Sequence, residues 1–100
     1  MGELVSIRTF LTVAEERSFS AAARLLNSTP ASITRTVAAL EDRLGIQLLL
    51  RTTRKVSLTS AGAAYAARVA PLAEGLARAT EETKDLQKVP AGSLKISAPM

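Results

Sequence analysis

The chain has 100 residues and a formal net charge of +4, and it contains neither cysteine nor histidine. This composition excludes disulfides and thiolate chemistry, and it removes the commonest general base and metal ligand, so we expect no metal site and no cofactor. Apolar residues make up 47% of the chain but aromatic residues only 3%, which predicts a thin, alanine-rich core. No run of about eighteen apolar residues occurs and the N-terminus does not resemble a secretory signal, so we expect a cytoplasmic protein with no membrane contact.

The positive charge is concentrated in the middle of the chain. Residues 17–73 hold eight basic and two acidic residues, whereas residues 1–16 are acidic and residues 74–100 are balanced. A basic surface suits the phosphate backbone of a nucleic acid. Many basic proteins bind no nucleic acid, so charge alone does not decide the function.

Two helices and a turn are predicted first. Apolar residues at helical spacing predict an amphipathic helix over residues 4–16. Ser20 is the expected N-cap of a short second helix over residues 21–26, whose alanines allow another helix to approach closely. Asn27 and Ser28 predict a turn, because asparagine tolerates the left-handed conformation.

A third helix is predicted over residues 30–44. Thr29 is its expected N-cap, and Pro30 fits the first helical position, where the amide has no helical partner. Gly45 follows the last apolar residue and is the expected stop. One apolar stripe follows the helical period, formed by Ile33, Val37, Leu40 and Leu44.

A hairpin and a long helix are predicted next. The β-leaning runs at residues 46–50 and 56–58 flank RTTRK and predict a small two-stranded hairpin, although its tip lacks the usual turn residues. Thr59 or Ser60 should cap a helix that runs to about residue 89 and is about 45 Å long. Pro71 predicts a kink in it, or alternatively a break. Residues 90–92 read as a hinge, and the strand-like residues 94–97 have no partner here, so we expect a further domain.

The long helix carries a heptad-like seam. Its apolar positions alternate between spacings of four and three residues: Tyr65, Val69, Leu72, Leu76, Ala79, Thr83 and Leu86. A rod of this length cannot bury that stripe against a thin domain of about 58 residues, which predicts a homodimer. The alternative is a helix that folds back as core of the same domain.

A helix, a tight turn, a second helix and a basic hairpin together place side chains in a DNA groove. Thr34 and Arg35 lie away from the apolar stripe of the third helix; Arg35 has alanine four residues away on either side and could reach guanine or a phosphate. The basic hairpin combines charge with hydroxyls and could enter a minor groove. An unpaired surface arginine and an ordinary basic loop are the alternatives. The candidate DNA-binding residues are Ser28, Thr29, Pro30, Ala31, Ser32, Thr34, Arg35, Arg51, Thr52, Thr53, Arg54 and Lys55.

Over nearly its whole length the chain resembles the N-terminal domain of LysR-type transcriptional regulators. The matching motifs are SFSAAARLLN (18–27), TPASITR (29–35), ALEDRLGIQLLLRTTRKVSLTSAG (39–62) and GSLKISAP (92–99). Two residues depart from the family pattern. Ser28 stands where an apolar residue is usual, and Thr34 replaces the usual serine.

The resemblance implies a mainly α fold: a winged helix-turn-helix over residues 1–58, a dimerising linker helix over 59–89, and a hinge with the start of an effector domain over 90–100. It implies that Pro30, Ala31, Thr34 and Arg35, on the recognition helix 30–44, contact the major groove. Arg54, in the wing 51–55, would approach the minor groove. Family members bind double-stranded DNA at imperfect palindromes as dimers or tetramers, and a small-molecule inducer would bind only in the missing C-terminal domain.

Three functions are weighed against these observations. A sequence-specific transcription regulator accounts for the helix-turn-helix, the basic hairpin and the seam together. An interaction module, in which the long helix acts and the basic face only solubilises it, is the second hypothesis. An enzyme is the weakest, because the adjacent carboxylates Glu41 and Asp42 on one helix cannot converge on one site.

Overall fold

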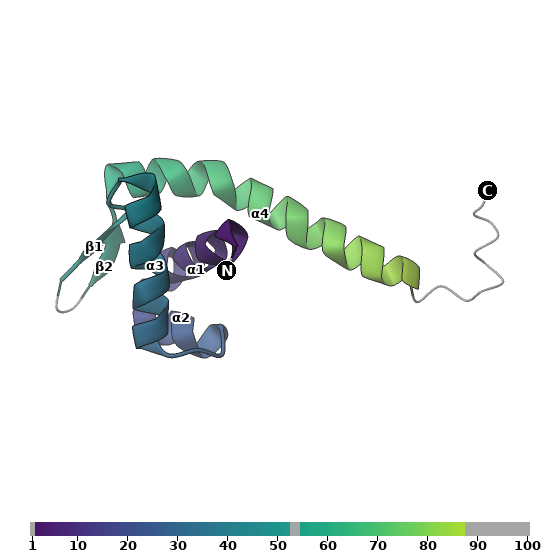
Figure 1. Cartoon of the computed structure of the whole chain (residues 1–100), viewed down its shortest axis with the longest axis horizontal. Helices are drawn as coiled ribbons and strands as arrows, with labels where there is room; N and C mark the ends of the chain where they lie inside the picture. Colours follow the sequence, from purple (N-terminus) through teal and green to yellow (C-terminus); the bar gives the residue numbers. More distant parts are fainter. Residues whose placement is uncertain (1, 53–54, 88–100) are drawn as a thin grey trace.

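The computed structural model describes residues 2–52 and 55–87. The predictions for Thr53, Arg54, the end of the long helix, the hinge and the strand-like run lie outside these residues. The described part comprises α1 (Glu3–Glu16), α2 (Phe19–Leu25), α3 (Pro30–Leu44), β1 (Leu49–Arg51), β2 (Val56–Leu58) and α4 (Ser60–Gln87). In Figure 1, α1, α2 and α3 pack together, the hairpin of β1 and β2 lies beside α3, and α4 extends away from them. The expected mainly helical winged fold is confirmed.

The cap of α2 differs from the prediction. Ser18, not Ser20, is the N-cap: its hydroxyl accepts a hydrogen bond from the Ala21 amide at 3.0 Å. Arg17 ends α1 in the left-handed conformation, with φ of 55°, and the chain leaves it in the extended conformation at Ser18. Helix α2 therefore begins at Phe19, and Ser20 is an exposed residue within its first turn.

The turn and the ends of α3 form as predicted. Asn27 has a φ of 53°, in the left-handed region, and the amide of Ser28 donates to the carbonyl of Ala23 at 2.8 Å. The Thr29 hydroxyl accepts from the Ser32 amide at 3.1 Å, and Pro30 is the first helical residue. Gly45 stops the helix with a φ of 69°. Neighbouring residues therefore fix where α3 begins and ends. Which side of the helix faces the solvent is determined by the apolar stripe, which is buried on the opposite side.

The core lies where α1, α2, α3 and the start of β1 meet. Its largest fully buried side chains are Phe10, Leu40, Leu48, Leu49, Val13 and Val37. The Tyr65 ring of α4 packs on Phe10, with ring centroids 5.9 Å apart. Burial raises the pKa of the Tyr65 phenol above its ordinary value; Glu3 adds to the rise and Arg43 opposes it, so the phenol is neutral at physiological pH.

Strand β1 starts later than the predicted 46–50. The observed ladder is antiparallel and pairs Leu49 with Leu58, Leu50 with Ser57 and Arg51 with Val56. At and before the start of β1, the backbone forms hydrogen bonds with side chains. A Glu41 carboxylate oxygen accepts hydrogen bonds from the Leu48 and Leu49 amides, and the Thr59 hydroxyl donates one to the Gln47 carbonyl. Residues 46–48 therefore form the entry to the hairpin rather than part of it.

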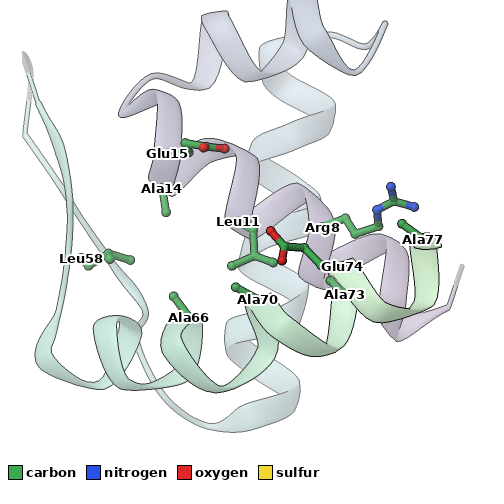
Figure 2. A pocket seen from close by; sticks show the side chains of 10 residues that line it. All are labelled: Arg8, Leu11, Ala14, Glu15, Leu58, Ala66, Ala70, Ala73, Glu74 and Ala77. Carbon is green, nitrogen blue, oxygen red and sulfur yellow. The ribbon is translucent and has the colours of Figure 1, made fainter. Parts of the chain in front are cut away.

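Helix α4 is continuous from Ser60 to Gln87 with Pro71 inside it, so the break that was the alternative to a kink does not occur. Figure 1 shows the helix changing direction about midway, as the predicted kink requires. Thr59 rather than Ser60 is the N-cap, since its hydroxyl accepts from the Gly62 amide at 2.8 Å. Figure 2 shows Ala66, Ala70, Ala73 and Ala77 of α4 facing a groove whose opposite wall includes Leu11 of α1.

Candidate nucleic-acid interface

The N-terminal half of α3 is open to solvent on the side away from the core. Pro30, Ala31 and Arg35 are exposed and Thr34 is half-buried, whereas Ile33 and Val37 are buried. This is the division that the apolar stripe predicts. Ser28 is also exposed, so its hydroxyl does not need a partner inside the protein.

Arg35 has no counter-ion. Among residues 2–52 and 55–87, the two ion pairs are Arg51–Glu41 and Lys84–Glu81, and no acidic side chain pairs with Arg35. Arg35 and Arg43 line the same hollow, which lies between α3 and Ser6 of α1. Arg43 was not among the predicted site residues, although its position two helical turns after Arg35 places both on one side of the helix. Two unpaired guanidinium groups on one helix suit phosphate or base-edge contacts.

Hydroxyl groups on the same stretch have different partners. The Thr36 hydroxyl donates to the Ser32 carbonyl at 3.0 Å, and the Thr29 hydroxyl is the N-cap of α3. In the described part of the chain, no hydrogen bond involves the hydroxyl of Thr34. Thr34 and Ser32 are therefore the hydroxyl-bearing side chains on α3 that are available for an external ligand, while Thr29 and Thr36 mainly serve the helix.

The structure describes three residues of the predicted RTTRK cluster, Arg51, Thr52 and Lys55, and all three are exposed. Lys55 is exposed, and its amide donates to the Thr52 hydroxyl at 2.9 Å, which closes the described end of the ladder. Arg51 is differently placed: it pairs with Glu41 and lies over the Phe19 ring. Thr53 and Arg54 lie outside the described residues.

The predicted seam divides into two parts. Tyr65 is half-buried against Phe10 of its own domain. This contact agrees with the alternative in which the long helix packs as core of the same domain. Further along α4, large apolar side chains are exposed: Leu72 by 66%, Leu76 by 52% and Leu86 by 68%. These leucines lie beside the alanine stripe that faces α1. One side of α4 therefore packs against its own domain, and the adjacent side, which carries the leucines, is exposed to solvent.

No helix within 2–52 and 55–87 is long and apolar enough to cross a membrane. The same residues contain no group of three or more Asp and Glu side chains placed to hold a metal ion.

Comparison with known proteins decides the family. The family model described as "Bacterial regulatory helix-turn-helix protein, lysR family" matches residues 4–63. The chain belongs to the lysR family. It is therefore a DNA-binding domain that serves the regulation of transcription, and its helix-turn-helix comprises α2, the turn at Asn27 and α3.

Named relatives and solved structures agree with this assignment. The HTH-type transcriptional regulator PgrR of Escherichia coli is 37% identical over 95% of this chain and 32% of its own length. CrgA of Neisseria meningitidis is 37% identical over 94% of this chain and 31% of its own length. The BenM DNA-binding domain, in a complex with benA site 1 DNA, is 34% identical with a TM-score of 0.77, covering 86% of this chain and 97% of that one.

A full-length variant of AphB is 36% identical with a TM-score of 0.80, and the match covers 88% of this chain and 30% of that one. The chain thus spans about a third of the length of the curated lysR-family relatives it matches.

Proposed function

We propose that this lysR-family domain binds double-stranded DNA with the N-terminal half of α3 in the major groove and the hairpin near the adjacent minor groove. The observation that carries the proposal is the exposed, unpaired Arg35 on the open side of a helix whose other side is locked into the core. A recognition helix contacts base edges through such N-terminal positions. Small neighbours at Ala31 and Ala38 allow it to lie deep in the groove.

Roles are assigned to the contact residues by their chemistry. Arg35 is the candidate for a two-hydrogen-bond contact with guanine, and Thr34 offers a hydroxyl and a methyl for thymine. Pro30 and Ala31 are proposed to contact the major groove and Arg54 the minor groove. Phosphate contacts are the proposed role of the polar and basic residues around them, to which Arg43 is added: Ser28, Thr29, Ser32, Arg43, Thr52, Thr53 and Lys55. Pro30 and Ala31 can contribute only backbone and apolar contacts.

We also propose that the chain forms a homodimer through α4. The exposed leucines at positions 72, 76 and 86 fall on the predicted heptad seam, and Val69, Ala79 and Thr83 lie on the same stripe. Burying this stripe against a second copy removes it from water. A symmetric pair of recognition helices would then read the two halves of an imperfect palindrome.

The protein's wider role follows from the family. We infer a winged helix-turn-helix over residues 1–58, a linker helix over 59–89, and a hinge leading to an effector domain from residue 90. That domain would bind a small-molecule inducer and allow tetramers to form. The protein would act in the cytoplasm, where bacterial DNA lies, and would have no catalytic activity.

Replacing Arg35 tests the proposed base contact. Arg35→Ala should weaken binding to a DNA site selected from random sequence by about 1–3 kcal/mol, with a smaller loss on random duplex. Both affinities can be measured by fluorescence anisotropy. Arg78→Ala, which removes the same charge from an exposed position on α4, should leave both nearly unchanged. An equal loss on selected and random DNA would make Arg35 a phosphate contact, and no loss on either would remove α3 from the interface.

A further inference from the structure

One carboxylate joins the recognition helix to the hairpin. A single oxygen of Glu41, on α3, accepts hydrogen bonds from the Leu48 amide at 2.8 Å and the Leu49 amide at 3.1 Å. The Glu41 side chain is only 16% exposed. Hydrogen bonds from backbone N–H groups to a carboxylate are charge-assisted, and two of them on one partly buried oxygen fix the position of the chain where β1 begins.

The other oxygen of the same carboxylate faces Arg51, at the end of β1. The Arg51 guanidinium lies 3.6 Å from it and 4.9 Å from the centroid of the Phe19 ring, at the start of α2. An exposed ion pair of this length contributes little to stability by itself. Its effect here is geometric, because the guanidinium is held between an acid on α3 and an aromatic ring on α2. Glu41 and Arg51 thus link both helices of the helix-turn-helix to the first strand.

The hairpin is too short to hold its position without contacts to the rest of the domain. Its ladder has three residue pairs, and an isolated two-stranded hairpin of this size is marginal in water. Its orientation relative to α3 must therefore come from contacts outside the ladder. The paired amides of Leu48 and Leu49 are among these contacts, and Arg51 extends them to the far end of the strand.

We propose that Glu41 and Arg51 are positioning residues that set the angle of the hairpin to the recognition helix, and that Arg51 supports DNA binding by holding the hairpin in place rather than as a phosphate contact. This inference rests on the proposed function. If the angle is set through Glu41, its loss should weaken DNA contacts made by the hairpin even though Glu41 itself does not touch DNA.

The sign of the effect distinguishes positioning from simple charge. Glu41→Gln removes a negative charge, so by electrostatics alone it should strengthen binding to DNA. As a positioning change it should weaken binding to a selected duplex about fivefold to tenfold and make the salt dependence shallower by about one phosphate contact. Asp42→Asn is the matched control. Asp42 is the neighbouring exposed acid on α3, so its neutralisation should leave affinity unchanged or slightly higher.

Arg51→Gln supplies a second test on a residue near the surface. If Arg51 acts through Glu41, the double variant Glu41→Gln with Arg51→Gln should lose no more affinity than the worse single variant. Additive losses would show that Arg51 contacts phosphate independently and would overturn the proposal. Glu41→Gln binding as tightly as the parent, with an unchanged salt slope, would also overturn it while leaving the proposed function standing. Failure of the parent chain to bind duplex would instead refute the proposed function itself.

Discussion

Gly62→Ala is expected to lower the free energy of unfolding by about 3 kcal/mol, the largest stability loss that we predict for one added methyl group in this domain. A β-carbon at position 62 would lie 2.0 Å from the carbonyl oxygen of Leu48 and 2.9 Å from its carbonyl carbon. The obstacle is backbone, so no side chain can rotate away. That carbonyl also accepts the Thr59 amide at 3.0 Å and cannot move without breaking the start of α4.

The loss should appear as a fall in the thermal midpoint of about 12–24 °C for a domain of this size. Gly75→Ala is the matched control, because Gly75 lies in the same helix and an added β-carbon there meets nothing within 4 Å. That change should raise stability by about 0.5–1 kcal/mol, since alanine favours the helix. Equal midpoints for the two variants would show that α4 does not pack tightly on residue 48.

Leu76→Glu is expected to raise the dissociation constant of the homodimer by about 100-fold or more. Leu76 is 52% exposed in the single chain and lies at the centre of the proposed seam. Burying a leucine is worth about 1.5–3 kcal/mol, a symmetric dimer contains the change twice, and the new carboxylates would repel each other. Sedimentation velocity across a range of concentrations measures the shift directly.

The control for the seam is Ala67→Glu. Ala67 is exposed and lies nine residues before Leu76, which places it on the opposite side of the helix. The substitution Ala67→Glu adds the same charge to α4 as Leu76→Glu and should leave the dimer intact. A parent chain that sediments as a monomer at every concentration would contradict the seam, as would equal weakening by both variants.

The sequence predicted those elements whose ends are fixed by neighbouring residues in the chain. Thr29, Pro30 and Gly45 fix the two ends of α3 within one turn of themselves, and Asn27 forms the turn before it. The apolar stripe then determines which side of α3 is buried. The exposure of Arg35 followed from these residues alone, because no contact from elsewhere in the chain was needed to place it.

The features that the sequence did not reveal depend on how α1 ends and on contacts between elements. The sequence predicted Ser20 as the cap of α2, but the left-handed Arg17 that ends α1 makes Ser18 the cap. Glu41 lies near the C-terminus of α3, where an acidic side chain is unfavourable to the helix dipole, yet it accepts hydrogen bonds from amides seven and eight residues later, across the turn at Gly45. Arg51 appeared to belong with the other basic residues of the hairpin, and only the fold shows its acid and aromatic partners.

We propose that the open side of α3 and the basic hairpin together bind the phosphate backbone of duplex DNA. Measuring the affinity of this chain for a duplex between about 50 and 200 mM salt tests it directly, because each neutralised phosphate adds about −0.9 to the slope of log affinity against log salt. We predict a slope of about −3 or steeper. A slope near zero, with affinity unchanged across that range, would contradict the account.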